Sequence, residues 1–156
     1  MLVREQPATE LTIATRILAR AGALTDDRRI TLRLRDVMYI GGRGVALSTM
    51  TPYDVAVVLV SDGSTLHGQA PADVAAYLDA HRRSPSAASV TQMAKGDYVG
   101  ASTLRGCVVA ALRRVRGEEP SASDDATIEA AWLDLVSQAR ISGALIGAFP
   151  TDEEAP

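Results

Sequence analysis

Residues 50–94 read MTPYDVAVVLVSDGSTLHGQAPADVAAYLDAHRRSPSAASVTQMA, and this stretch decides the fold class. Its near-continuous apolar run, residues 54–60, is rich in valine and predicts a strand that is buried on both faces. Asp62 and Gly63 supply the turn chemistry of a hairpin, with residues 65–67 as the return strand. A helical pattern and another short strand follow. This succession of strands and helices indicates an α/β protein.

The rest of the chain alternates between strand-like and helical spacing of apolar residues. Ile30, Leu32 and Leu34 alternate with polar neighbours, which is the period-two pattern of a half-buried strand. The other expected elements are a strand over 37–40, a strand over 88–93, and helices over 10–24, 71–83, 99–115 and 125–146. We expect one domain, 1–156, folded as a three-layer-like sandwich in which helices cover a mostly antiparallel sheet. Residues 1–8 and 151–156 are expected to be flexible.

Composition limits the kinds of partner. At 156 residues, with 47% hydrophobic and 22% charged residues, the chain has the composition of a globular domain with a real core. Its net charge of −3 predicts neither nucleic acid nor an anionic membrane as a partner, so a small molecule or a protein is expected. No stretch approaches the roughly 20 apolar residues that span a bilayer, and the N-terminal segment is acidic rather than basic. We therefore expect a cytoplasmic protein.

The order of motifs in residues 50–94 resembles the class II aldolase/adducin family. In that family a threonine-proline-x-aspartate strand entry precedes a D-G turn, a P-S-S-E loop, a helix and a strand that ends in His-x-His. Here Thr51, Pro52 and Asp54 match the strand entry. The resemblance covers roughly residues 10–116. It implies the class II aldolase-like α/β sandwich and a ring-like homo-oligomer, often a tetramer, with sites at subunit interfaces.

The residues that should hold the family's zinc are replaced. The resemblance places the family's glutamate at Asp73 and its two histidines at Gln92 and Ala94. No histidine follows His81, and the segment that would carry a third histidine ligand is expected to be missing. Because a catalytic zinc site needs about three converging ligands, the sequence predicts no metal, no cofactor and no classical zinc aldolase activity.

Three further residues are potential ligands or nucleophiles. His67 is expected in the return strand of the hairpin and His81 near the end of an exposed helix, so surface or packing roles are favoured over a shared metal. Cys107 is the only cysteine, and it lies in an apolar helical stretch. A buried core position is favoured for it over a nucleophilic role.

A glycine-rich turn suggests where an anion would bind. Gly41, Gly42 and Gly44 interrupt the strand pattern and allow a ligand to approach the backbone closely. The resemblance implies that this turn and a second segment bind a substrate phosphate or carboxylate, and Arg43 falls on the turn while Arg29 falls on the second segment. Since guanidinium groups bind such anions bidentately, the hypothesis is substrate binding by Arg29, Arg43 and Gly44. Solvated arginines are the alternative.

Four residues are hypothesised to be catalytic. Asp73 retains a carboxylate at the position implied to do acid/base work, although a role at the start of a helix is favoured, where it would accept backbone N–H bonds. Gln92, Lys95 and Tyr98 would polarise a substrate oxygen in place of zinc. Lys95, the only lysine, is a potential base or Schiff-base residue. A surface loop position is favoured for it.

Two functions are compatible with these residues. The first is a metal-independent lyase, isomerase or cyclase that acts on a small anionic oxo-acid or a related metabolite. The second is a non-catalytic, adducin-like assembly or regulatory subunit. The retained Asp73, glycine turn and Gln92 favour the enzyme. An open polar cavity that joins Arg43, Asp73 and Gln92 is the feature that separates the two.

Overall fold

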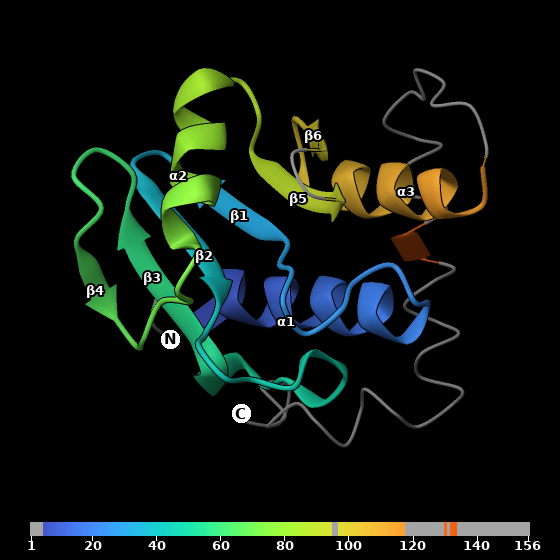
Figure 1. The fold of residues 1–156 in the computed structure, drawn as a ribbon, viewed down its shortest axis with the longest axis horizontal. Helices are drawn as coiled ribbons and strands as arrows, with labels where there is room; N and C mark the ends of the chain where they lie inside the picture. Colours follow the sequence, from blue (N-terminus) through green and yellow to red (C-terminus); the bar gives the residue numbers. More distant parts are fainter. Residues whose placement is uncertain (1–4, 95–96, 118–129, 131, 134–156) are drawn as a thin grey trace.

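The computed structural model describes residues 5–94, 97–117, 130 and 132–133 (Figure 1). The helices and strands in chain order are α1 (Glu5–Arg20), β1 (Thr31–Leu34), β2 (Val37–Gly41), η1 (Leu47–Thr49), η2 (Pro52–Asp54), β3 (Val55–Leu59), β4 (Thr65–His67), α2 (Val74–Arg83), β5 (Ser89–Ala94), β6 (Asp97–Ala101) and α3 (Leu104–Val115). No helix among these described residues is long and apolar enough to cross a membrane.

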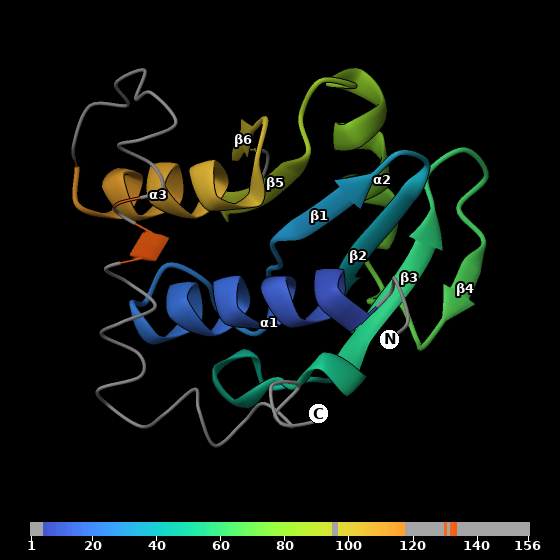
Figure 2. The same cartoon turned by 180° about the vertical axis from the view of Figure 1, so that it is seen from behind.

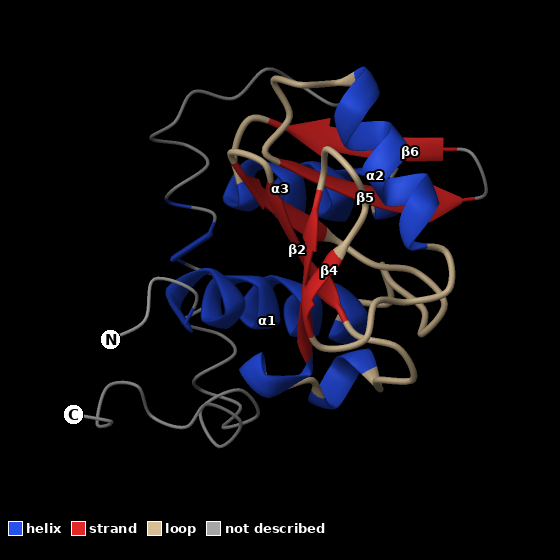
Figure 3. Cartoon of the chain, turned by 90° about the vertical axis from the view of Figure 1, so that its left-hand side faces the viewer, coloured by secondary structure: helices blue, strands red, loops and turns tan. Residues whose placement is uncertain are grey.

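The strands form an antiparallel layer. Strands β1 to β4 pair in sequence order, as the hairpin patterns predict, and β5 pairs with β6. The two sheets meet at β1 and β5, where Ile30 forms an isolated bridge with Thr91 and the Arg33 amide donates to the Ala88 carbonyl over 2.7 Å. The hairpin β5–β6 therefore extends the layer beyond β1 (Figure 3).

Helices cover both faces of this layer. Helix α1 lies on one face beside α3, and α2 lies on the opposite face (Figures 1 and 2). The core on the α1 face includes Leu11, Ala14, Leu18, Ile30, Leu32, Tyr39, Val55, Val57, Cys107 and Val108. The core on the α2 face includes Met38, Ile40, Ala56, Val58, Val60, Tyr77, Leu78 and Val90. Residues of β2 and β3 alternate between the two cores, so the buried valine-rich strand and the α/β sandwich predicted from the sequence are confirmed.

The first helix starts earlier than expected. Helix α1 begins at Glu5, so residues 5–8, which were expected to be flexible, belong to a helix. Pro7 is accommodated because the first turn of a helix needs no partner for its amide. The predicted stop is confirmed at Gly22, which has a φ of +78° and follows the last helical residue, Arg20.

The predicted helix over 99–115 is wrong in its first part. Residues up to Ala101 form β6, and α3 begins only at Leu104. The Thr103 side chain caps α3 by accepting a hydrogen bond from the Gly106 amide at 3.0 Å. Pairing with β5 overrides the local helical spacing, because a strand position depends on a partner that is remote in the sequence.

Most of the expected last helix, 125–146, lies outside the described residues, as does the segment 151–156. Residues 130, 132 and 133 are helical, and Trp132 is buried in the core shared with α1 and α3. The Arg105 guanidinium lies 5.3 Å from the centroid of the Trp132 ring, which is the geometry of a cation–π contact. Trp132 therefore joins the packing of α3.

Candidate functional site

The glycine turn is held against two neighbouring segments. The Gly42 amide donates to the Asp54 carbonyl over 2.8 Å, and the Arg43 amide donates to the Gln69 carbonyl over 2.9 Å. A Cβ at Gly42 would lie 2.6 Å from the Asp54 oxygen, so this close approach requires glycine. Gly44 has a φ of +74° and is exposed. The turn thus has a defined shape and an open outer side.

Arg29 does not line this open side. Its side chain is buried, with Nε 3.2 Å from the Gly41 carbonyl oxygen and Nη2 3.1 Å from that of Gly42. Nη1 donates to the carbonyls of Asp26 and Arg28. Four of its five N–H donors are therefore used by backbone oxygens. The sequence-based expectation that Arg29 lines an anion pocket is replaced by an internal bracing role.

Arg43 differs from Arg29 in its exposure and in the number of its hydrogen bonds. It is exposed, and Nε donates to the Ala70 carbonyl over 3.2 Å. This bond directs the side chain over the loop that leads to α2, whose N-cap residue is Asp73. Nη1 and Nη2 have no hydrogen-bond partner in the described part of the chain. Arg43 is thus the arginine that the structure leaves available to a planar anion.

Asp73 occupies the helix start that the sequence predicts, but its side chain does not cap the helix. It is the N-cap residue of α2, and the carboxylate accepts no capping hydrogen bond. The Pro71 carbonyl accepts a hydrogen bond from the Val74 amide at 3.1 Å, and the Asp73 carbonyl accepts one from the Ala76 amide at 3.0 Å. Backbone groups thus replace the side chain, which contradicts the expected capping bonds and leaves the carboxylate exposed.

Gln92 and Tyr98 are brought together on the face that α2 covers. They are opposite each other in the register of β5 and β6, so their side chains project from the same face of the hairpin. Both are partly buried. Burial raises the pKa of Tyr98, and the negative charge of Asp73 raises it further. Asp73, Gln92 and Tyr98 therefore lie on one side of the sheet.

Tyr77 is the functional residue that the sequence analysis missed. It is fully buried in α2, and its ring meets that of Tyr98 edge-on. Its hydroxyl oxygen accepts a hydrogen bond from the Arg29 amide at 2.8 Å. Burial raises the pKa of Tyr77 above its ordinary value of 10.0. A tyrosine on the buried face of a helix needs a hydrogen-bond partner for its hydroxyl. That requirement could have identified Tyr77 from the sequence.

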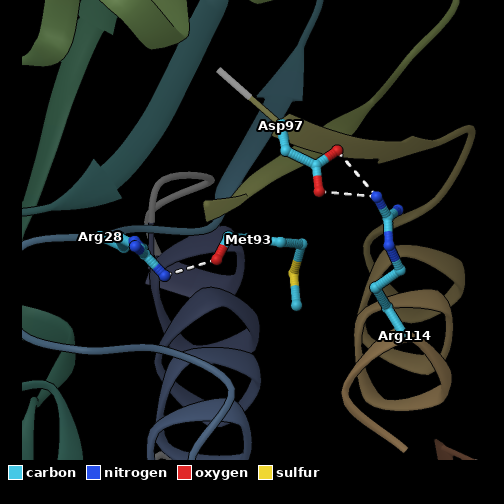
Figure 4. Close-up of polar contacts among 4 residues, drawn as sticks. All are labelled: Arg28, Met93, Asp97 and Arg114. Carbon is cyan, nitrogen blue, oxygen red and sulfur yellow. Dashed lines mark hydrogen bonds and ion pairs between the residues drawn. The ribbon is translucent and has the colours of Figure 1, made fainter. Parts of the chain in front are cut away.

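Lys95 lies outside the described residues, so its proposed role stays a prediction. The described residues on either side of it, Met93 and Asp97, are anchored (Figure 4). Arg28 donates through Nη1 to the Met93 carbonyl, and Nη2 of Arg114 lies 2.6 and 2.8 Å from the two carboxylate oxygens of Asp97. These contacts come from opposite sides of the hairpin, so tertiary contacts set the positions of Met93 and Asp97.

The histidines and the cysteine do not meet. His67 is exposed in β4, whereas His81 is fully buried, so its packing role is confirmed and the expected exposure of its helix is wrong at this residue. Nε2 of His81 lies 2.6 Å from Oγ1 of Thr31. Cys107 is buried as predicted, and burial raises the pKa of its thiol to about 12. A thiol with that pKa is not a nucleophile at neutral pH.

The described residues do not fit the zinc that the resemblance implies. The positions concerned carry the Asp73 carboxylate, the Gln92 amide and the alanine Ala94, whose side chain has no donor atom. Within residues 5–94, 97–117, 130 and 132–133, no group of three or more histidine, cysteine, aspartate or glutamate side chains could hold a metal ion. No chemical step is therefore derived through a metal.

Comparisons with solved structures agree on one fold. The chain has the fold of the class II aldolases. An aldolase II superfamily protein from Pseudomonas syringae matches with a TM-score of 0.69 and 12% identity over 92% of this chain and 96% of that one. L-fuculose 1-phosphate aldolase from Glaciozyma antarctica matches with a TM-score of 0.58 and 13% identity over 84% and 82%.

A more similar sequence belongs to a longer protein. YgbL from Escherichia coli, described as a candidate aldolase, epimerase or decarboxylase, matches with 24% identity and a TM-score of 0.53 over 59% of this chain. The chain spans 45% of the length of YgbL. No family model matches the sequence, and no curated protein matches it. The resemblance read from the motifs is thus confirmed at the level of the fold.

Proposed function

We propose that this protein is a lyase- or isomerase-type enzyme that acts on a small anionic oxo-acid without the zinc of the class II aldolases. The observation that carries the proposal is the register of β5 and β6, which sets the Gln92 amide opposite the Tyr98 phenol on the face that α2 covers, where the charge of Asp73 also raises the pKa of Tyr98. A carboxylate beside a phenol that stays protonated is a base beside a hydrogen-bond donor. The class II aldolase fold supports the same reaction class.

Each residue has a separate task in the proposed reaction. The guanidinium of Arg43 binds the substrate carboxylate or phosphate beside the glycine turn. Asp73 takes a proton from the carbon next to the substrate carbonyl, the C–H electron pair forms a C=C bond, and the carbonyl π electrons move to oxygen. Tyr98 and Gln92 donate hydrogen bonds to that oxygen, because preorganised donors stabilise an enolate without a metal.

Exchange of substrate hydrogen for deuterium tests the proposal. The protein would be incubated with pyruvate in D₂O while the methyl signal is followed by proton NMR. The wild type should catalyse its loss, and Asp73→Asn and Tyr98→Phe should each slow the loss by about 100-fold or more. Asp62→Asn is a matched control because Asp62 is another exposed carboxylate, which lies in the turn between β3 and β4 and accepts hydrogen bonds from the Ser64 amide and hydroxyl.

A second control tests whether the effect of Tyr98→Phe is specific to the Tyr98 phenol or follows from the loss of any tyrosine hydroxyl. Tyr53 is 79% exposed, so Tyr53→Phe should leave the exchange rate unchanged. If the wild type exchanges neither pyruvate nor other short oxo-acids, the enzyme proposal is wrong and the non-catalytic reading takes its place. The homo-oligomer expected from the resemblance remains a prediction. Light scattering coupled to size-exclusion chromatography would measure the mass of the protein in solution.

A further inference from the structure

Arg29 connects three parts of the site through both its side chain and its backbone. We propose that Arg29 is a positioning residue, which fixes the glycine turn so that Arg43 can bind the anion and holds α2 and β5 beside it. The inference rests on the proposed function for the anion and goes beyond it in the residue concerned. Arg29 touches none of the reacting atoms and acts through Gly41, Gly42, Tyr77 and Thr91.

The side chain of Arg29 holds the turn from inside. Nε and Nη2 donate to the carbonyls of Gly41 and Gly42 at 3.2 and 3.1 Å, two residues and one residue before Arg43. A Cβ at Gly41 would lie 3.2 Å from Cδ of Arg29 and 3.1 Å from the sulfur of Met50, so the side chain packs closely against the turn. These contacts orient the peptide that leads directly into Arg43.

The backbone of Arg29 reaches the other two parts. Its amide donates to the Tyr77 hydroxyl at 2.8 Å, and its carbonyl accepts from Oγ1 of Thr91 at 3.0 Å. Tyr77 supports the ring of Tyr98, and Thr91 precedes Gln92 in β5. A shift of Arg29 would therefore move the anion-binding turn, the phenol and the amide together.

The chemistry of arginine explains why this residue suits the position. The side chain is 4% exposed, and a buried charge is costly unless hydrogen bonds satisfy it. The planar guanidinium directs rigid donors to several carbonyls at once, whereas an ammonium is a compact point charge on a flexible stem. Lysine at position 29 would retain the charge and lose part of this geometry.

Amide exchange and anion titration of the full-length protein would test the inference. Inorganic phosphate and pyruvate serve as probes, and binding is followed by the amide resonances of Arg43 and Gly44. Arg43→Gln should abolish binding and leave exchange at Gly42 unchanged. Arg29→Gln should weaken binding at least about tenfold and speed hydrogen exchange at the Gly42 and Arg43 amides by a similar factor, because the turn opens more often. Arg29→Lys should bind the anion more tightly than Arg29→Gln, and its Gly42 and Arg43 amides should exchange more slowly than in that variant.

A matched control separates positioning from general destabilisation. Arg33 is partly buried and, like Arg29, bonds to backbone carbonyls, with Nη1 3.1 Å from the His81 carbonyl oxygen and Nε 2.7 Å from that of Arg35. Arg33→Gln should leave anion binding and the turn amides as in the wild type. If Arg29→Gln fails to fold, Arg29→Lys still decides, because positioning requires weakened binding together with faster exchange at the turn in that variant.

Two results would overturn the inference. Lost anion binding in Arg29→Gln with unchanged exchange at Gly42 and Arg43 would mean that Arg29 contacts the anion directly. Unchanged binding and exchange would mean that the turn needs no support from Arg29. Failure of the proposed function would look different, because the wild type itself would then bind neither phosphate nor pyruvate at Arg43.

Discussion

Tyr98 meets the ring of Tyr77 edge-on, with the two ring centroids 6.0 Å apart and the ring planes at 84°. This arrangement joins the hairpin β5–β6 to α2. Of the two hydroxyl groups, that of Tyr77, the more deeply buried ring, is the one with a hydrogen bond to the described part of the chain. The Tyr77 hydroxyl accepts from the Arg29 amide, whereas the Tyr98 side chain is partly exposed near Asp73. One tyrosine is thus supported by the core and the other is accessible to solvent.

The two tyrosines should respond differently to loss of the hydroxyl. Tyr98→Phe keeps the ring contact, so the free energy of unfolding should change by less than about 0.5 kcal/mol. Tyr77→Phe leaves the buried Arg29 amide without an acceptor and should lower the free energy of unfolding by about 1–3 kcal/mol. Urea unfolding of both variants measures the difference, and equal losses would contradict the assignment.

Stability should depend on the protonation of His81. Burial, and then the positive charge of Arg33, lower the pKa of His81 from 6.5 to about 4. The unfolded chain therefore binds more protons than the folded chain between these values. This contribution to stability is fully present above pH 6.5 and is lost as the pH falls towards 4, by up to about 3 kcal/mol.

Urea unfolding from pH 7.5 to 4 measures this dependence. His81→Gln should flatten the loss of stability between pH 6.5 and 4, because glutamine cannot take up the proton. His67→Gln is the control, since His67 is the other histidine of the chain and lies exposed in β4. A flattened profile in His67→Gln and a wild-type profile in His81→Gln would reverse the assignment.

The glycine turn should tolerate alanine unequally. Alanine at Gly42 would place its Cβ 2.6 Å from the Asp54 carbonyl oxygen, so backbone must move, and a loss of about 1–3 kcal/mol is expected. Alanine at Gly44 meets no atom within 4 Å, and only its φ of +74° is unfavourable, so a loss of about 1 kcal/mol is expected. Thermal unfolding of the two variants ranks them, and the reverse order would show that the turn is not held against Asp54.

The Asp97–Arg114 ion pair should add little to stability. Its side chains are 43% and 45% exposed, so water and salt screen the charges. Arg114→Gln should lower the free energy of unfolding by less than about 1 kcal/mol at low salt and by less still in 1 M NaCl. Denaturant curves at two salt concentrations provide the measurement. A larger loss that persists in high salt would show that Arg114 contributes by packing.

Removal of divalent metal should not affect the protein. The full chain, purified without added metal, should contain substoichiometric zinc by elemental analysis, because the positions implied to bind zinc carry Asp73, Gln92 and Ala94. Treatment with EDTA should leave both the unfolding midpoint and the deuterium exchange of pyruvate unchanged. One bound zinc per chain would overturn the metal-independent part of the proposed function.

Local patterns were sufficient for much of the fold. The valine-rich run of β3, the Asp62-Gly63 turn and the stop at Gly22 were predicted because each depends on residues within a few positions. The burial of Cys107 followed from its apolar neighbours in the helix. The resemblance in motif order placed these elements in the class II aldolase fold, which the structural matches support.

The errors arise from pairings that the side-chain pattern does not show. Residues 99–101 have helical spacing, yet they pair with β5, and only the folded chain provides that partner. The Asp73 side chain does not cap α2 because a turn that begins at Pro71 supplies a backbone carbonyl instead. Neither the pairing of residues 99–101 with β5 nor the bond from Val74 to Pro71 can be recognised from the neighbouring side chains.

The sequence by itself determined which residue types are available to the site: a carboxylate at Asp73, an amide at Gln92, a phenol at Tyr98 and a pair of arginines. Tertiary structure alone decided which of these side chains are buried and which are exposed. Arg29 and Arg43 carry the same group, but one is buried against backbone carbonyls and the other is exposed. Burial depends on the whole fold, so an arginine that braces the site and one that is open to an anion look alike in the sequence.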